Sequence, residues 1–387
     1  MLLAGAALLI RTYIALRQVN PGFDARNVLT LEMFLTGDRL KTAGIARVAH
    51  DGRERLDAIP GAEASAFTCC LPLYGSYKLP FNIVGRPTGE TPWNGGTRWT
   101  SGSPGYLAVF KIPLLRGRDF TEQDDTAAPG VVLISDTLAK KYWLNQDPIG
   151  QMLLIGKGIG PEWVDAPRRI IGIIGDVHDE GLNRDPEPLM MIPSAQVPNG
   201  STTLIANIGP MNWAVRTLGD PHQYIPAITE QLRLASGGFP VARVRPMTDI
   251  VVQSTARQDF NMLLLTIFGA TALILAAIGI YGLMAYSVQQ RTQEIGIRMA
   301  LGADRSRIRE LVVWQGMRLA IVGVVIGVAA AFGLTRYLAS FLYGVESWDP
   351  LVFVTVPLIL SAVALIAVWF PATRASRLDP QQALRIE

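Results

Sequence analysis

The chain of 387 residues is poor in the residue types on which most catalytic and metal sites depend. It contains two cysteines and three histidines. A phosphate-binding Gly-x-x-x-x-Gly-Lys-Ser/Thr loop is missing. Residues 156–160 come closest, but no Ser or Thr follows Lys157, so a glycine-rich turn is expected there. The Gly-x-Ser-x-Gly elbow of α/β-hydrolases is missing too. We therefore predict no catalytic residue, no cofactor and no enzyme activity in this chain.

Few polar clusters remain as candidates for a metal or redox site. Cys69 and Cys70 are adjacent, and a disulfide between neighbours strains the peptide that joins them, so we expect two small apolar residues in a buried strand. Residues 176–180 (DVHDE) resemble a metal site, but at a strand end such a cluster is usually a solvated turn. The acidic residues Glu122, Asp124 and Asp125 indicate a solvated loop. No metal site is predicted.

Charge is nearly absent from three long stretches after residue 260. Residues 261–288 and 351–370 contain no charged residue, and residues 311–335 contain only Arg318. About 20 apolar residues in a helix cross a bilayer, and a long Arg side chain can reach the headgroups. We therefore predict three transmembrane helices over these ranges. Because none holds Asp, Glu, Lys or His, an ion or proton pathway through the bilayer is not expected.

The basic residues of this region are distributed unevenly. Five arginines lie between the first two predicted spans and three follow the third, whereas Arg336 alone lies between the second and third. The positive-inside rule places residues 289–310 and the C-terminal tail in the cytoplasm, and everything before residue 261 outside it. Between residues 19 and 258, 23 Lys and Arg balance 24 Asp and Glu, so no nucleic-acid surface is expected.

The first residues form a shorter apolar segment. Residues 1–10 are apolar but too few to cross a bilayer, and they lack the basic start and cleavage site of a signal peptide. We interpret residues 1–18 as a partial first transmembrane helix, and the chain as the C-terminal part of a longer protein.

Residues 19–258 have the pattern of an extracytoplasmic α+β domain. Two β-α-β units are predicted, one at each end of the domain, and together they would form a split, ferredoxin-like layer. The first comprises a strand at 28–35, a helix at 40–59 and a strand at 62–71. The second comprises a strand at 212–217, a helix from Asp220 to Ser236 and a strand at 241–245.

An inserted strand-rich subdomain is predicted between these units, at residues 72–209. Its expected strands are 131–135, 169–177 and 204–208, with a short helix at 136–144. After the domain, a helix capped by Thr248 is expected to lead into the first span. Asp349-Pro350 is expected to begin the last span and Pro371 to end it, and a short tail helix is expected from Asp379.

Two candidate sites accompany the spans in the permease region, residues 259–387. Between spans one and two, a predicted helix carries Glu294 and Arg298 four residues apart, exposed apolar groups such as Ile297, and Gly302 as its C-cap. Such a helix suits either a soluble partner or the lipid surface. In the second span, Gly323, Gly327 and Ala331 share a face on which another helix could pack closely.

Several strings in this sequence resemble the MacB/FtsX-type permease family of bacterial ABC transporters. The most specific is EIGIRMALGA at residues 294–303, and PATRA at 371–375 and DPQQALR at 379–385 resemble the family's C-terminal signature. PLLRGRDF at 113–120, DPIG at 147–150 and IGIIGDV at 171–177 are similar to the MacB-like periplasmic core domain.

The resemblance implies four transmembrane helices per unit, a separate or fused ABC-type ATPase, and a homodimer or second permease half. It also implies an inner-membrane location, a periplasmic domain moved by the ATPase for export or efflux, and a periplasmic or outer-membrane partner. Glu294, Ile297, Arg298 and Gly302 would couple the permease to the ATPase. Two alternatives remain open: an FtsX-like regulator that activates periplasmic partners such as cell-wall hydrolases without transport, and a stand-alone sensor.

Overall fold

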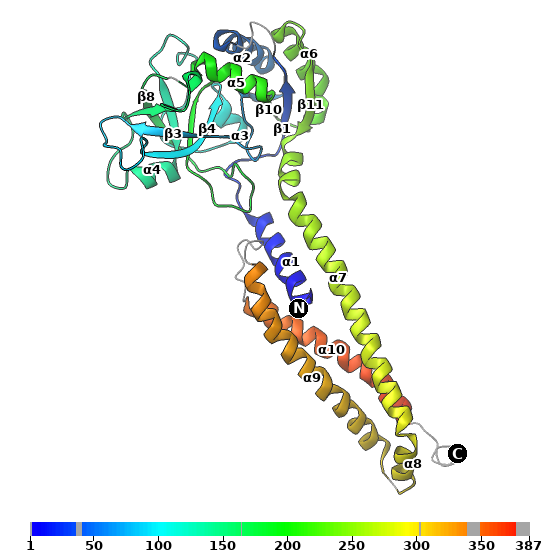
Figure 1. The fold of residues 1–387 in the computed structure, drawn as a ribbon. Helices are drawn as coiled ribbons and strands as arrows, with labels where there is room; N and C mark the ends of the chain where they lie inside the picture. The colour runs from blue at the N-terminus through cyan, green and yellow to red at the C-terminus, as the bar shows by residue number, and fades with distance from the viewer. Residues whose placement is uncertain (1, 36–40, 164, 302, 339–348, 377–387) are drawn as a thin grey trace. The chain divides into compact units, whose positions relative to one another are not determined.

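The computed structural model describes residues 2–35, 41–163, 165–301, 303–338 and 349–376, which form two compact units. One is an α/β domain, Val19–Thr255, and the other is helical, combining Met1–Gln18 with Ala256–Glu387 (Figure 1). Several predicted features lie outside the described residues. They are Gly302, most of the loop at 336–350, Arg377, the expected tail helix from Asp379, and Arg385.

The α/β domain contains the predicted ferredoxin-like layer. Its strands lie in the order β11-β1-β10-β2, and every neighbour is antiparallel. The two β-α-β units, though far apart in sequence, therefore share one sheet, as predicted. The elements are β1 (Val28–Met33), α2 (Thr42–Asp57), β2 (Ala62–Thr68), β10 (Met211–Thr217), the 3-10 turn η4 (Pro221–Tyr224), α6 (Ile225–Ser236) and β11 (Val241–Pro246).

The core of this layer centres on Trp213 of β10. Trp213 is fully buried, pairs with Leu31 on one side and Phe67 on the other, and stacks edge-on against Phe67 at 5.0 Å between ring centroids. Gly52 of α2 lies directly over the indole, where a Cβ would overlap the ring. The helix can therefore approach the sheet closely because residue 52 has no side chain.

The insert between the two units is strand-rich, as predicted, and its strands close on themselves. The pairings run β4-β3-β7-β8-β6-β9, β9 returns to pair with β4, and β5 pairs with β8. The elements are β3 (Tyr77–Ile83), β4 (Gly95–Gly102), α3 (Tyr106–Phe110), β5 (Leu114–Gly117), β6 (Val131–Ser135), α4 (Asp136–Tyr142), β7 (Met152–Ile155), η2 (Pro161–Trp163), β8 (Arg168–Ile174), β9 (Leu189–Pro193), η3 (Ser194–Gln196) and α5 (Asn199–Ile208).

One predicted strand is wrong. Residues 204–208 are the second half of helix α5, which buries Ser201, Thr202 and Ile205 at helical spacing. The start of α5 is fixed to α2, since Thr42 Oγ1 lies 2.7 Å from Thr202 Oγ1 and the Thr42 N–H donates to Asn199 Oδ1 at 3.0 Å. A short, mostly apolar run such as residues 204–208 (LIANI) is ambiguous between strand and helix, and these tertiary contacts favour the helix.

The helical unit contains α1 (Leu2–Gln18), α7 (Met247–Gln290), α8 (Thr292–Ala300), α9 (Arg305–Leu338) and α10 (Pro350–Ala375). The first residues of α7 belong to the α/β domain. Among the described residues, α7, α9 up to Leu334, and α10 are long and apolar enough to cross a membrane, and the three predicted spans overlap them.

Two of the predicted helix boundaries need correction. Thr248 lies inside the first turn of α7, which begins at Met247, so Thr248 does not cap it. Asp349 caps α10 as expected, accepting from the N–H groups of Leu351 and Val352, and it also pairs with Arg11 of α1. Pro371, in contrast, does not end α10, because the helix continues to Ala375 with Ala372 and Ala375 buried against the other helices.

Candidate functional site

The most distinctive feature of the helical unit is the short helix α8, which connects α7 to α9. Its inner face carries Ile295, 8% exposed, and the half-buried Met299. Both belong to an apolar cluster with residues of the three long helices, among them Met284, Ile308 and Val368. The inner face of α8 therefore packs against the ends of the three long helices α7, α9 and α10.

The outer face of α8 is exposed and mixed in character. Glu294 and Arg298 are four residues apart, and so are Ile297 and Leu301, so these two pairs lie side by side on one side of the helix. Ile297 is 45% exposed and Leu301 84% exposed, and Arg298 Nη2 donates to Glu294 Oε1 at 2.5 Å. The structure thus brings three of the four predicted coupling residues together, while Gly302 lies outside the described residues.

Beside α8 lies a hollow of about 310 Å³ between α7, α8 and the start of α9. Arg291, Arg298 and Arg307 line it with one acid, Glu294, so its charged lining sums to +2. Arg291 Nη1 donates to Gln315 Oε1 at 3.1 Å, a neutral partner. The sequence predicts that these arginines lie on one side of the membrane, but it does not predict the hollow.

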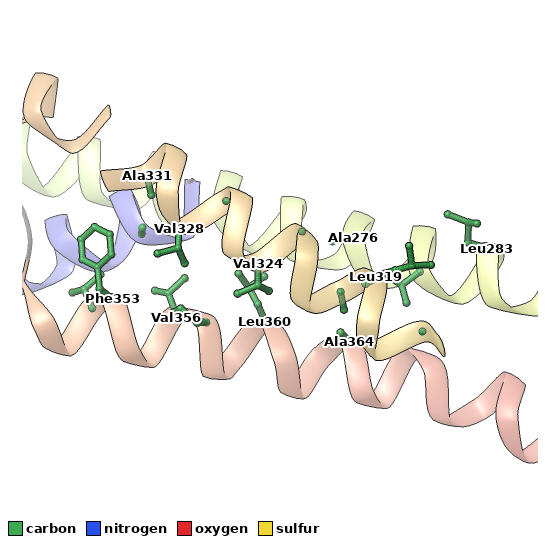
Figure 2. Close-up of a pocket in the computed structure, with 18 of the residues that line it drawn as sticks. Ala276, Leu283, Leu319, Val324, Val328, Ala331, Phe353, Val356, Leu360 and Ala364 are labelled. Carbon is green, nitrogen blue, oxygen red and sulfur yellow. The ribbon is translucent and has the colours of Figure 1, made fainter. Parts of the chain in front are cut away.

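A second, apolar groove of about 400 Å³ lies between α7, α9 and α10. Figure 2 shows Val324, Val328 and Ala331 of α9 facing Val356, Leu360 and Ala364 of α10. Gly323 and Gly327 also line this groove, but a Cβ on either would meet no described atom within 4 Å. Their role in close helix packing stays a prediction.

The glycine of α9 in close contact with other helices is Gly316, which was not among the predicted packing residues. A Cβ there would lie 2.7 and 2.8 Å from the two methyl groups of Val368 and 3.2 Å from Met284 Sδ. The signal was present, since Gly316 and Ala320 extend the row of Gly323 and Gly327 by one turn each. Gly316 allows α7, α9 and α10 to meet at this level.

The polar residues singled out in the α/β domain have structural partners. Asp176 accepts from the N–H and the hydroxyl of Thr137 at 2.9 and 2.6 Å, and the buried His178 places Nδ1 2.8 Å from the Arg184 carbonyl oxygen. Among the described residues no group of three His, Cys, Asp or Glu is arranged to hold a metal ion. Cys69 and Cys70 are free and buried just after β2, and burial raises the pKa of Cys70.

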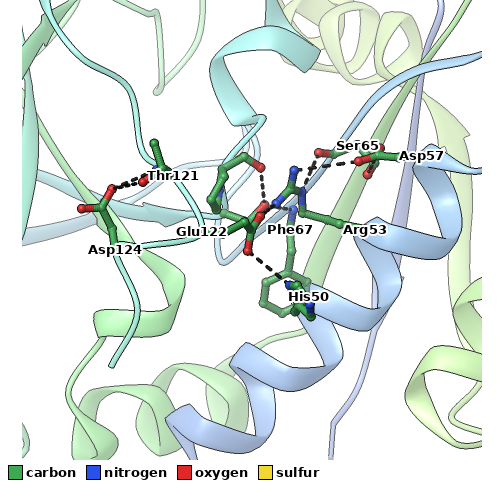
Figure 3. A network of polar contacts seen from close by, with 10 residues as sticks. His50, Arg53, Asp57, Ser65, Phe67, Thr121, Glu122 and Asp124 are labelled. Atoms are coloured by element: carbon green, nitrogen blue, oxygen red, sulfur yellow. Dashed lines mark hydrogen bonds and ion pairs between the residues drawn. The ribbon is translucent and has the colours of Figure 1, made fainter. Parts of the chain in front are cut away.

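The prediction of a solvated acidic loop at 122–125 is wrong for Asp124, whereas Glu122 and Asp125 are exposed as expected. Asp124 is 6% exposed and accepts from Arg118 and from Thr121. Burial alone would raise the pKa of Asp124, but these hydrogen bonds lower it overall. Glu122 pairs with Arg53 and lies 3.2 Å from His50, both of α2, as Figure 3 shows. The loop is therefore fixed to the ferredoxin-like layer.

Both units match described protein families. Residues 76–216 match the MacB-like periplasmic core domain, and residues 266–380 match the FtsX-like permease C-terminal family. The "Macrolide export ATP-binding/permease protein MacB" of Azoarcus sp. is 27% identical over 382 residues, covering 92% of this chain and 55% of that protein. The "Pyoverdine export ATP-binding/permease protein PvdT" of Pseudomonas savastanoi pv. phaseolicola is 27% identical over 291 residues, covering 73% of this chain and 42% of that protein.

The chain spans about half the length of the curated relatives it matches. Among solved structures, the chain is similar to the periplasmic region of MacB from Actinobacillus actinomycetemcomitans. The match covers 61% of this chain and 95% of that structure, with 15% identity and a TM-score of 0.38. The two family matches follow the division seen in the structure, with one in the α/β domain and the other in the helical unit. The chain therefore combines a MacB-like periplasmic core domain, over residues 76–216, with an FtsX-like permease C-terminal region, over residues 266–380.

Proposed function

We propose that this chain is a permease subunit of an ABC transporter in the bacterial inner membrane. In this proposal α8 faces the cytoplasm and receives an ABC-type ATPase, and the α/β domain lies in the periplasm. ATP binding and hydrolysis by the partner would then drive movement of the periplasmic domain during export or efflux.

The observation that carries the proposal is the two-sided character of α8. Ile295 and Met299 anchor its inner face among the ends of the long helices, so a force applied to α8 reaches them directly. Ile297 and Leu301 remain exposed on the outer face beside the Glu294–Arg298 pair. Apolar side chains next to a charged pair are typical of a surface that binds a soluble partner.

Two further facts support the assignment. The names of the relatives join ATP-binding and permease functions in one protein, and this chain matches about half of each relative. The sequence has no Gly-x-x-x-x-Gly-Lys-Ser/Thr loop, so ATP hydrolysis would belong to a separate or fused ATPase. A homodimer or a second permease half would complete the membrane part, and a periplasmic or outer-membrane partner would receive the cargo.

The coupling assignment can be tested by reversing charges on α8. Glu294→Arg and Arg298→Glu would each place like charges four residues apart on the docking face. We expect each variant to reduce co-purification of the ATPase and to lower permease-stimulated ATP turnover by about tenfold, the effect of roughly 1.4 kcal/mol. The double swap restores the pair and should recover part of both.

A matched control lies in α6 of the periplasmic domain. Glu230 and Arg233 form an ion pair of similar exposure, 52% for each side chain, against 52% and 50% for Glu294 and Arg298. Glu230→Arg should leave ATPase capture and turnover unchanged. If the α8 variants behave like this control, α8 is not the docking surface, and the coupling proposal fails.

A further inference from the structure

The hollow beside α8 has charged and apolar linings in separate parts. Arg291 lies between α7 and α8 and Arg307 lies in the first turn of α9, and Arg307 makes no ion pair with any described residue. The rest of the lining is largely apolar and includes Ile295, Leu311 and Val312. A ligand that fits this lining therefore has an anionic part and an apolar part.

The apolar groove of Figure 2 continues the hollow along the same two helices. Met284 lines both spaces. On α7 the lining passes from Ser287 and Val288 to Leu283 and Ile280, and on α9 it passes from Gln315 to Leu319. The two spaces thus adjoin at Met284, whose side chain lies at their junction. Together they make up a candidate lipid path that is cationic at the α8 end and apolar along the spans.

Aromatic and basic side chains mark the same end of the bundle as the membrane surface. Arg309 lies over the Trp369 ring at 5.0 Å, and Arg374 Nη1 donates to the Tyr281 hydroxyl at 3.3 Å. Trp314 is 63% exposed. Trp, Tyr and Arg gather where a span reaches the lipid headgroups, so the cationic hollow lies at headgroup level.

We propose that this path binds an anionic glycerophospholipid. The phosphate of the headgroup would contact Arg291 and Arg307, and an acyl chain would lie between α7 and α9 beside Met284 and Leu319. Basic pockets between transmembrane helices bind anionic headgroups because the charge is paired where water is scarce. The inference goes beyond the proposed function, since it requires only that these helices cross a bilayer.

The bound lipid would act on the position of α8. Arg298 and Glu294 both line the hollow and pair with each other, so a phosphate bound there competes with the Glu294 carboxylate for the Arg298 guanidinium. Occupancy of the hollow would therefore change the charge that α8 presents to a partner.

The test uses the full chain purified in detergent, stripped of lipid and titrated with dioleoyl phosphatidylglycerol or dioleoyl phosphatidylcholine. Native mass spectrometry counts the bound lipids. We expect preferential binding of phosphatidylglycerol, reduced about thirtyfold by Arg291→Gln with Arg307→Gln, since each Arg near an anionic headgroup contributes roughly 1 kcal/mol. Arg305→Gln is the control, because Arg305 is an exposed arginine of α9 outside the hollow.

A second pair of variants tests the acyl path. Ala320→Trp would fill the groove, whereas Val322→Trp adds the same side chain at a 57% exposed position of α9 outside it. We expect the first to weaken phosphatidylglycerol binding and the second to leave it unchanged, with thermal unfolding confirming that both are folded.

Three outcomes would overturn the inference. The first is equal binding of the two lipids, or equal loss with Arg305→Gln. The second is binding of glycerol 1-phosphate as tight as that of the lipid, which would show a phosphate site without an acyl path. The third is a dimer that persists in the delipidated protein and dissociates with Ala320→Trp, which would assign the groove to a second copy of this chain.

Discussion

Arg216, near the end of β10, shows how single residues fix the α/β domain. Its side chain is 3% exposed and donates to the carbonyl oxygens of Val109, Arg26 and Asp24 at 2.7, 2.8 and 2.6 Å. One guanidinium thus joins the ferredoxin-like layer to helix α3 of the insert and to the segment that enters the domain. Removing it would leave three carbonyl groups without this donor.

Arg216→Met should therefore lower the free energy of unfolding by about 3 kcal/mol or more. The expected fall in Tm is roughly 10 °C for a domain of this size, measured by tryptophan fluorescence of the detergent-purified chain. Arg233→Ala, which removes an exposed ion pair, should change the Tm by no more than about 2 °C. Similar shifts for the two variants would contradict the role given to Arg216.

Asp24 adds a pH dependence at the same place. Hydrogen bonds from Arg26 lower the pKa of Asp24 to about 2, with Arg216 nearby adding to the effect. Because this value lies below the usual ~3.9, the ionised carboxylate stabilises the fold above about pH 4, and the contribution is lost as the pH falls through about 2. Asp24→Asn should lower the free energy of unfolding by about 1 kcal/mol at pH 7. This is less than the pKa shift of Asp24 alone would give, because solvent screens the exposed Asp24–Arg26 pair. The Tm difference from the parent chain should shrink as the pH approaches 2, and a constant difference would refute this assignment.

The small residues of α9 are not equivalent. Gly316→Leu places atoms where Val368 and Met284 already lie, so we expect it to lower the Tm of the purified chain by several degrees. Gly323→Leu faces the open groove and should leave the Tm of the monomer unchanged. A loss of dimer with Gly323→Leu would support the predicted helix-packing role of Gly323 and Gly327.

At the scale of elements, the sequence predicted the helices and strands that have a clear hydrophobic periodicity and clear turn or capping residues at their ends. The split β-α-β layer follows from strands and helices with clear periodicity and turn residues, such as the Asp220-Pro221 start. The second half of helix α5 was wrongly predicted as a strand because its short apolar pattern does not distinguish a strand from a helix. The contacts that fix the helix join it to Thr42, which lies 157 and 160 residues away in the sequence. Pro371 was misread because a proline inside a helix can be tolerated where the surrounding helices hold the next turn in place.

Substitutions on the two faces of helix α8 should have different effects on stability and on ATPase binding. Ile295→Asn buries an amide among Met284, Ile308 and Val368, so both the Tm and the stimulation of ATP turnover should fall. Ile297→Asn changes an exposed side chain and should weaken ATPase binding by about tenfold without lowering the Tm. Thermal unfolding and ATPase titration on the same preparations separate the two effects. A loss of Tm with Ile297→Asn would mean that this face packs within the chain.

At the scale of the whole molecule, hydropathy and charge predicted the three long helices, because both properties can be read from a continuous stretch of the sequence. Closure of the insert strands by pairing of β9 with β4 was not predictable, since the paired residues lie about 90 positions apart, as with Arg98 and Leu189. The cationic hollow was equally hidden, because it forms only when the end of α7 meets the start of α9.

The orientation of the chain in the membrane is the claim on which the proposed function rests. Single cysteines at Leu218 in the α/β domain, 74% exposed, and at Leu301 on α8, 84% exposed, can be labelled in a chain whose buried Cys69 and Cys70 are replaced by alanine. A membrane-impermeant maleimide applied to spheroplasts should label Leu218→Cys at once and Leu301→Cys only after the membrane is permeabilised. Labelling of Leu301→Cys in sealed spheroplasts, with Leu218→Cys protected, would contradict the proposed function.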